Sequence, residues 1–323
     1  MSTTEYNIYD FMSANKKATH IFTDAYNLAR GKNFLEAIDR FQEAIELDPE
    51  FGLAYHQMGN AYLQLPNYQK ALEAYIAATE KGFAVGDSFH GCGLCSYMLG
   101  YYENALKFLN AAIEHNPNLA DAYYDRGNTY LALQDVDSAL ADYNKHISYG
   151  SEKFEAFFNR AMIFIDRQEY EKALADLNEA RVLYPSNWKV LYNRAHCNYQ
   201  LGRLDKAVSD YKMTLFINPF FSEGYYCLGT ALYEMEDYDG AIHNQTQVIK
   251  FNPEEALGYF ARGLSYLTIG KYDEAITDLE KSASINENDA ETYYLLSECY
   301  SGKGDEMKAQ TLLEKAKALG YVE

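Results

Sequence analysis

Basic residues are scarce in this sequence, and so are tryptophan, proline and cysteine. Lysine and arginine together number 28 against 47 acidic residues, which gives a net charge of −19 with neutral histidines. A chain this acidic lacks the cations that would attract nucleic acid or an anionic membrane surface. It also lacks a run of about 18 apolar residues that could span a bilayer and the basic start and apolar core of a secretory signal. We therefore predict a cytoplasmic protein that binds neither nucleic acid nor membranes.

A period of 34 residues runs through the chain. With Ala18 as position 1, nine segments of 34 residues follow one another to Glu323 without an insertion or deletion. Two small residues twelve positions apart recur in every segment, as two antiparallel helices require where their backbones approach closely. Position 20 is alanine in all nine segments: Ala37, Ala71, Ala105, Ala139, Ala173, Ala207, Ala241, Ala275 and Ala309. Position 8 is always small: Ala25, Gly59, Gly93, Gly127, Ala161, Ala195, Gly229, Gly263 and Ser297.

Large apolar residues recur at helical spacing in two separate runs of each segment. They occupy position 4 in all nine segments and position 24 in eight of the nine, which predicts two helices per segment. Glycine or proline at position 15 marks the turn between the helices in five segments. Proline at position 32, or Gly82 and Gly150 at position 31, ends the second helix. Gln245 at position 24, and His146 and Thr214 at position 27, depart from the pattern and predict looser or hydrated packing there.

The pattern resembles the tetratricopeptide repeat (TPR) family over residues 18–323. The resemblance implies an all-α fold, an α-solenoid in which antiparallel helix pairs form a right-handed superhelix and the first helices line a concave groove. Residues 1–17 precede the repeats as a separate segment and contain an apolar cluster. This cluster fits a cap over the first helix, a ligand for the chain's own groove, or a disordered segment. Its members are Tyr6, Ile8, Tyr9, Phe11 and Met12.

Cysteine and histidine recur at fixed repeat positions, which favours packing over chemistry. Cys92 and Cys95 have the spacing of half a redox or metal site, but no second pair follows at a suitable spacing. His56 and His90 occupy position 5, where every segment carries an aromatic ring. The sequence also lacks a phosphate-binding loop, a zinc-protease motif, a nucleophile elbow and an EF-hand loop. We therefore predict a protein that is not an enzyme and holds no metal or cofactor.

Charges at positions 7 and 23 predict one another. In four segments arginine at position 7 accompanies aspartate at position 23, and the first segment has the reverse order, Asp24 with Arg40. In the other four segments both positions are uncharged. An arginine between two helices needs a carboxylate, which its planar guanidinium binds through two N–H groups. We predict that all five pairs bridge the two helices of one repeat and do not bind a ligand. The four regular pairs are Arg126–Asp142, Arg160–Asp176, Arg194–Asp210 and Arg262–Asp278.

Polar and aromatic residues of the fourth to sixth segments form the candidate peptide site. The TPR resemblance invites comparison with the carboxylate clamp for acidic chaperone tails, and Asn128, Asn159 and Lys189 match three of its five places. Two cations of the clamp are missing, because a tyrosine and an asparagine stand in their places, and nearby carboxylates favour a neutral or basic segment. Side-chain amides can bond both donors and acceptors of a peptide backbone, and rings offer apolar contact. The predicted groove residues are Tyr124, Asp125, Asn128, Phe158, Asn159, Lys189, Tyr192, Asn193 and His196.

These observations favour a non-catalytic scaffold or adaptor. It would bind a peptide or helix of another protein in its groove. Two alternatives stay open. One is a structural protein that assembles with itself through its terminal helices, for example as a homodimer through the C-terminal helix. The other is a co-chaperone-like adaptor with a degenerate carboxylate clamp.

Overall fold

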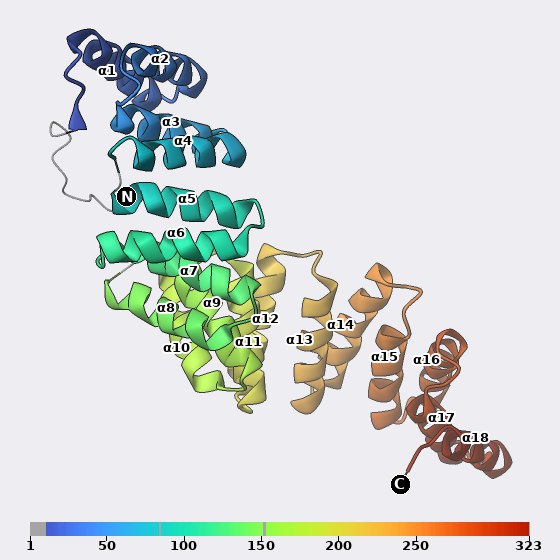
Figure 1. Ribbon diagram of the computed structural model, residues 1–323. Coiled ribbons are helices and arrows are strands. Elements are labelled where there is room, and N and C mark those ends of the chain that lie inside the picture. The colour runs from blue at the N-terminus through green and yellow to red at the C-terminus, as the bar shows by residue number, and fades with distance from the viewer. Residues whose placement is uncertain (1–10, 84, 151–152, 323) are drawn as a thin grey trace. The chain divides into compact units, whose positions relative to one another are not determined.

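The computed structural model describes residues 11–83, 85–150 and 153–322, and all of their regular secondary structure is helical (Figure 1). Eighteen helices lie within these ranges and form nine successive pairs, one pair for each 34-residue segment. This arrangement confirms the prediction of two helices per segment. The chain forms two compact units, Met1–Ala156 and Phe157–Glu323. The helices of the first unit are α1 (Lys16–Arg30), α2 (Phe34–Leu47), α3 (Gly52–Gln64), α4 (Tyr68–Glu80), α5 (Gly86–Met98), α6 (Tyr102–His115), α7 (Ala120–Ala132) and α8 (Val136–Ser148). Helix α9 (Phe154–Asp166) contains the unit boundary, and the second unit continues with α10 (Tyr170–Leu183), α11 (Trp188–Gln200), α12 (Leu204–Ile217), α13 (Ser222–Glu234), α14 (Tyr238–Phe251), α15 (Ala256–Thr268), α16 (Tyr272–Ile285), α17 (Ala290–Gly302) and α18 (Glu306–Ala318).

The turn inside each pair uses a left-handed backbone at position 15. Glycine provides it in four segments, for example at Gly100 with φ of 81°, because glycine adopts this conformation without steric cost. Lys32, Gln134, Gln168 and Glu236 adopt it as well, with φ between 59° and 64°. These four segments have neither glycine nor proline at position 15, yet all of them turn at the predicted position. The surrounding helix pair therefore imposes a conformation that these four residues do not favour on their own.

The small residues of the repeat lie where the two helices of a pair touch. Alanine at position 20 is completely buried in the first eight segments and 7% exposed at Ala309. At position 8, a Cβ added to Gly59 would stand 2.9 Å from the ring of Tyr75, and one added to Gly93 would stand 2.5 Å from Leu109. Both distances are shorter than real contacts, so these helices could not pack as closely with larger residues. The predicted close approach is confirmed.

The three departures from the repeat pattern are buried and hydrogen bonded. The Oγ of Ser265 donates to Oε1 of Gln245 at 3.0 Å, and Gln245 is 3% exposed. The Thr214 hydroxyl donates to the backbone carbonyl of Asp210 at 2.9 Å. The His146 Nδ1 lies 2.8 Å from a backbone carbonyl, so it carries the proton and donates. The prediction of loose packing is therefore wrong for Gln245 and Thr214, whose bonds lie within the protein. At His146 the Nε2 is buried without a hydrogen-bond partner among the described residues, so the predicted hydration stays a prediction there.

Residues 11–15 pack against the first helix pairs. The Phe11 ring meets Phe83 edge to face, with 4.8 Å between ring centroids. The Ser13 hydroxyl donates to a carboxylate oxygen of Asp48 at 2.5 Å. The Asn15 side chain accepts from two backbone N–H groups at the start of α1, and its amide donates to the Leu47 carbonyl at 3.0 Å. This part of the N-terminal segment thus ties the start of α1 to the end of α2, and Tyr6, Ile8 and Tyr9 lie outside the described residues.

Candidate functional site

Four of the five predicted arginine–aspartate pairs bridge the two helices of one repeat. In each of them the guanidinium Nε lies 2.7 Å from the aspartate Oδ2, and a second N–H bonds the other carboxylate oxygen. The aspartate side chains are between 5% and 9% exposed. A guanidinium that is at most 20% exposed and already holds a carboxylate through two N–H groups is poorly placed to bind the carboxylate of a peptide. These residues hold the scaffold together, as the sequence predicted.

The prediction is wrong for the fifth pair, Asp24 with Arg40. The Arg40 guanidinium instead bonds Glu43, one helical turn away, at 2.7 Å, and the Asp24 carboxylate lies 3.8 Å from His20 on its own helix. Both members of the predicted pair are about half exposed, with side-chain values of 46% and 55%. Because water solvates both charges, nothing forces them together, and each pairs with a neighbour on its own helix.

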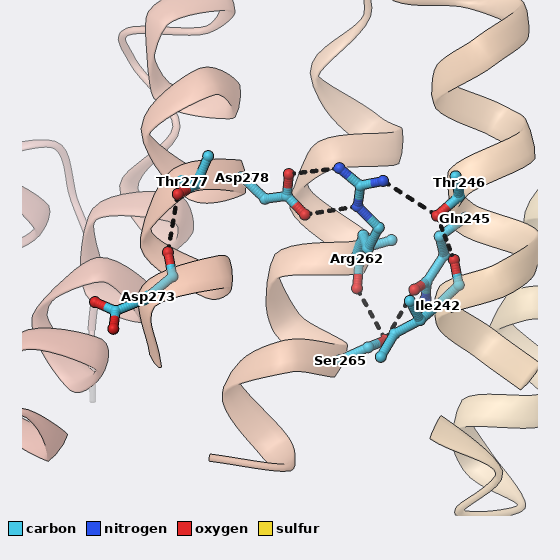
Figure 2. A network of polar contacts seen from close by, with 9 residues as sticks. Ile242, Gln245, Thr246, Arg262, Ser265, Asp273, Thr277 and Asp278 are labelled. Carbon is cyan, nitrogen blue, oxygen red and sulfur yellow. Dashed lines mark hydrogen bonds and ion pairs between the residues drawn. The ribbon is translucent and has the colours of Figure 1, made fainter. Parts of the chain in front are cut away.

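The bridging arginines also reach back to the preceding repeat. Figure 2 shows Arg262 between the carboxylate of Asp278 and the hydroxyl of Thr246, which stands 3.1 Å from Nη1. Arg126 and Arg194 bond an asparagine at the same repeat position through Nη1, at 2.6 Å and 3.2 Å. Each of these arginines therefore connects three helices: its own, its partner helix and the second helix of the preceding pair. This third partner is not among the predicted contacts, although it lies sixteen residues before the arginine in all three cases.

In the first unit, the predicted groove residue Asp125 is part of an ion pair. Its Oδ2 lies 2.6 Å from Nε2 of His90, and both side chains are less than one-fifth exposed. Burial opposes charge on the imidazole, but the hydrogen bond and the charge of Asp125 outweigh it, so the pKa of His90 is raised. The pair connects α5 to α7. Asp125 thus already has a histidine partner within the protein.

The other two predicted residues of the first unit also have partners within the protein. The hydroxyl of Tyr143 donates to Oδ1 of Asn128 at 2.6 Å. The Tyr124 ring packs against His146, and the Lys153 ammonium lies 3.8 Å from the centroid of the Tyr124 ring. Burial raises the pKa of the Tyr124 phenol. All three predicted residues of this unit therefore take part in packing and internal bonds.

In the second unit, helix α11 places three polar side chains on one face. Lys189, Asn193 and His196 are separated by four and three residues, the spacing that aligns side chains along a helix. The Asn193 amide donates to the Lys189 carbonyl at 2.8 Å. Within the described residues, the Lys189 ammonium, the Asn193 Oδ1 and both His196 ring nitrogens have no hydrogen-bond partner. Burial lowers the pKa of His196, so its imidazole is neutral near pH 7. Helix α11 therefore offers a cation, an acceptor and a neutral ring together.

Tyr192 lies beside these groups and bonds the next repeat. Its hydroxyl donates to a carboxylate oxygen of Glu223 on α13 at 2.7 Å and lies 3.7 Å from the Cys227 sulfur. Burial, together with this thiol and carboxylate, raises the pKa of the tyrosine. Phe158 and Asn159 lie on α9 and are half-buried. The second unit thus carries six of the nine predicted residues, on two consecutive first helices.

Hydrogen bonds between consecutive first helices recur further along the same unit. The Tyr233 hydroxyl lies 2.9 Å from the Thr268 hydroxyl, and the Tyr199 hydroxyl bonds Glu234. Both contacts join residues 35 positions apart, one more than the repeat period. Sequence reasoning missed these contacts, although a search for polar pairs at that separation would have found them. We use the name first-helix face for one surface of the first helices α9, α11, α13 and α15. It is formed by Phe158, Asn159, Lys189, Tyr192, Asn193, His196, Tyr199, Glu223, Tyr233, Glu234 and Thr268.

The cysteines and histidines set aside in the sequence are buried packing groups. Burial raises the pKa of Cys92 and of Cys95 to about 12, so neither thiol ionises near pH 7. His56 bonds the Ser88 hydroxyl at 2.9 Å, and burial lowers its pKa to about 4. No group of three or more potential metal-binding side chains occurs in residues 11–83, 85–150 and 153–322. Across the same ranges, every helix is too short or too polar to traverse a lipid bilayer.

Comparison with known protein families gives matches along most of the chain. One sequence profile of the family described as tetratricopeptide repeat matches residues 24–84, 158–220 and 226–290, more than half of the chain. Two further profiles of the same description match residues 108–141 and 290–319. No curated protein matches the sequence at a significant level.

Solved structures with the same fold are distant in sequence. YrrB, described as a TPR protein with an unusual peptide-binding site, is 22% identical with a TM-score of 0.56, over 59% of this chain and 98% of YrrB. A tetratricopeptide repeat protein from Parabacteroides merdae is 18% identical with a TM-score of 0.51, over 88% of this chain and 99% of its own. MamA from Desulfovibrio magneticus is 21% identical with a TM-score of 0.51, over 52% of this chain and 96% of its own. These likenesses support the α-solenoid fold.

Proposed function

Because the chain belongs to the tetratricopeptide repeat family, whose members are typically non-catalytic interaction scaffolds, we propose that it is a cytoplasmic scaffold that binds a peptide segment of another protein. The first-helix face is the binding surface. All five cysteines are free thiols, which fits a reducing compartment.

The unpaired polar groups of α11 carry this proposal. Lys189, Asn193 and His196 point their free donors and acceptors from one side of a helix, and Tyr192 adds an apolar surface beside them. An extended peptide requires this mixture, because its backbone needs donors and acceptors and its side chains need apolar contacts. The peptide-binding site named in the description of YrrB agrees with such a role.

A neutral or basic peptide fits this surface best. Glu223 and Glu234 stand on the first-helix face of α13, and the whole chain carries −19. Two of the three cations of a carboxylate clamp are absent, because Tyr124 and Asn193 take their places. In the first unit, Tyr124, Asp125 and Asn128 use their side chains internally, so we propose that they stabilise their own unit and do not bind the peptide.

The test is a selection from a displayed library of random 12-residue peptides against the full chain. Affinities of the selected peptides are then measured by fluorescence anisotropy. Asn159→Ala combined with Asn193→Ala is expected to weaken their binding about thirtyfold, since each of the two lost hydrogen bonds contributes on the order of 1 kcal/mol. Gln69→Ala, an exposed amide change on α4, is the control and should bind as the wild type. Equal binding by the double variant would remove the first-helix face as the binding surface.

Self-assembly through the last helix is a second candidate. Met307 on α18 is 83% exposed, and Leu296 and Leu312 contribute apolar lining to a cleft of about 450 Å³ between α16 and α18. Sedimentation equilibrium of the wild type and of Met307→Ser separates the two proposals. If the wild type is a dimer that the substitution dissociates, self-assembly is favoured. If the wild type is a monomer at all concentrations, the peptide-binding scaffold is favoured.

A further inference from the structure

A second interaction surface lies on the opposite helices of the same unit. Helices α10 and α12 are the second helices of consecutive pairs, and they form the walls of a cleft of about 620 Å³ whose floor is α11. Asn178 comes from α10, Arg194 from α11, and Lys206 and Ser209 from α12. This cleft shares no residue with the first-helix face.

Apolar side chains extend the cleft along both walls. Val182 follows Asn178 by one helical turn on α10, and Met213 and Phe216 follow Ser209 by one and two turns on α12. Side chains at these spacings lie in one row along a helix. Val182 is 75% exposed and Phe216 is 83% exposed, so the apolar end of the row faces solvent. We call these residues, together with the cleft, the α10–α12 face.

Large apolar residues at this repeat position are confined to these two helices. Val182 and Phe216 both occupy position 29, which is glutamate, lysine, serine or alanine in the other seven segments. Phe220, in the turn after α12, is 80% exposed and packs edge to face against Phe251. A helix end that is polar in nearly every repeat and apolar in two consecutive ones is typical of a contact surface.

The charges around this face are mostly positive and unpaired. Two ion pairs line the cleft, one between Arg194 and Asp210 and one between Arg203 and Glu171. Lys206 has no ion pair among the described residues, and the same holds for Arg181, next to Val182, and for Lys212, next to Met213. One lining carboxylate, Asp205, lacks a cation as well. By the same measure Glu179, next to Asn178, is exposed and has no ion pair among the described residues. Three free cations thus stand against two free carboxylates on a chain of net charge −19, and this local excess of positive charge attracts an acidic partner.

The geometry points to an acidic amphipathic helix of another protein as the ligand of the α10–α12 face. Two neighbouring helices form a groove into which a third helix packs its apolar side, with anchors at positions i, i+3, i+4 and i+7. Carboxylates on the flanks of that helix meet Lys206, Arg181 and Lys212. A second copy of this chain fits less well, because two chains of charge −19 repel each other.

The probe is a fluorescein-labelled synthetic helix of about 16 residues, which is about 24 Å long. It has leucine along one side and glutamate on both flanks, and it is titrated against the full chain by anisotropy. One comparison peptide has lysine in place of every glutamate, and another has two prolines within the helix. We expect saturable binding of the acidic helix in the range of tens of micromolar, no binding of the lysine peptide, and at least about tenfold weaker binding of the proline peptide.

Matched variants locate the site. Phe216→Ser introduces the residue found at this position in the fourth and eighth segments, and it should weaken binding about tenfold or more because a buried phenylalanine contact is lost. Leu35→Ser, on α2 and also exposed at 70%, is the control and should not change binding. Lys212→Glu should weaken binding several-fold at low salt and less at high salt. Circular dichroism checks that each variant keeps its helices.

Several outcomes would overturn the inference. They are no saturable binding of the acidic helix up to about 1 mM, equal affinity for the proline or lysine peptide, or unchanged affinity of Phe216→Ser and of Val182→Ser. A wild-type dimer that Phe216→Ser dissociates in sedimentation would assign the face to a second copy instead. The variant with Asn159→Ala and Asn193→Ala should bind the acidic helix as the wild type does. Loss of binding there would place the acidic helix on the first-helix face, so the inference and the proposed function fail in different experiments.

Discussion

Breaking one arginine–aspartate bridge by removing a single partner should destabilise the protein more than replacing both partners. Arg262 and Asp278 illustrate the case, with side chains 20% and 6% exposed and two hydrogen bonds between them. Arg262→Ala leaves a carboxylate almost without water or partner, for which we expect a loss of about 3 kcal/mol in local stability. Asp278→Ala leaves a guanidinium that is better exposed and still bonded to Thr246, so about 2 kcal/mol is expected.

The repeat before Arg262 and Asp278 shows which residues can replace both partners. The preceding repeat has Leu228 and Asn244 at the two positions, and the Asn244 amide donates to a carbonyl of its own helix at 2.8 Å. Arg262→Leu combined with Asp278→Asn copies this arrangement and leaves no isolated charge. We expect it to cost about 1 kcal/mol or less, since an uncharged pair of similar volume avoids the desolvation of two ions.

Native-state hydrogen exchange of α15 and α16 measures these effects locally. Repeat proteins do not in general unfold in a single step, so a global melting curve would mix the responses of distant repeats. Lys303→Ala removes an exposed ion pair with Asp273 and serves as the control, with little change expected. If the double variant opens as easily as Arg262→Ala, or if Arg262→Ala opens no more easily than wild type, the reasoning about isolated buried charge is wrong.

Four further predictions concern the titration of two histidines, the polar core and the N-terminal segment. The pKa of His56 falls from 6.5 to about 4 on folding, so the protein loses stability as the pH drops from 6.5 towards 4. The melting temperature of His56→Phe should therefore depend less on pH over that range than the melting temperature of the wild type. The pKa of His90 is raised, so its contribution is lost as pH rises above 6.5, and the stability gap between wild type and His90→Phe should narrow from pH 6 to pH 9. Gln245→Leu should stabilise α14 and α15 by about 1 kcal/mol in hydrogen exchange, because Ser265 keeps its bond to a backbone carbonyl at 3.1 Å; faster exchange there would contradict this. Deletion of residues 1–17 should lower the melting temperature, and an unchanged value combined with tighter peptide binding would favour a ligand for the chain's own groove.

Positions that every repeat shares were predictable from the sequence. Alanine at position 20 recurs because no larger side chain fits between the helices, so its burial follows from recurrence alone. The four regular arginine–aspartate bridges were predictable for the same reason, since each charge occurs only with its partner. The contacts of Asp24 and Arg40 were not predictable in this way. Both side chains are exposed and bond other residues, and the charge pattern of the repeats does not show whether a side chain is exposed. Repetition thus reveals contacts that packing enforces.

Contacts between consecutive repeats were harder to foresee. Thr246 as a third partner of Arg262, and His90 as the partner of Asp125, each join residues of different segments. A pattern aligned within one segment does not show such neighbours. The same limit applies to the candidate site, where the sequence predicts six residues of α9 and α11 but does not predict that Tyr192 bonds Glu223. The residue types that recur at fixed repeat positions indicate the fold. Which polar groups stay without a partner depends on the packing of one repeat against the next.

Hydrogen exchange of the full chain with and without a selected peptide tests the central claim most directly. If the first-helix face binds the peptide, amides of α9 and α11 should exchange more slowly in the complex, while those of α10 and α12 keep their rates. Slower exchange confined to α10 and α12, or to α16 and α18, would contradict the assignment of peptide binding to the first-helix face.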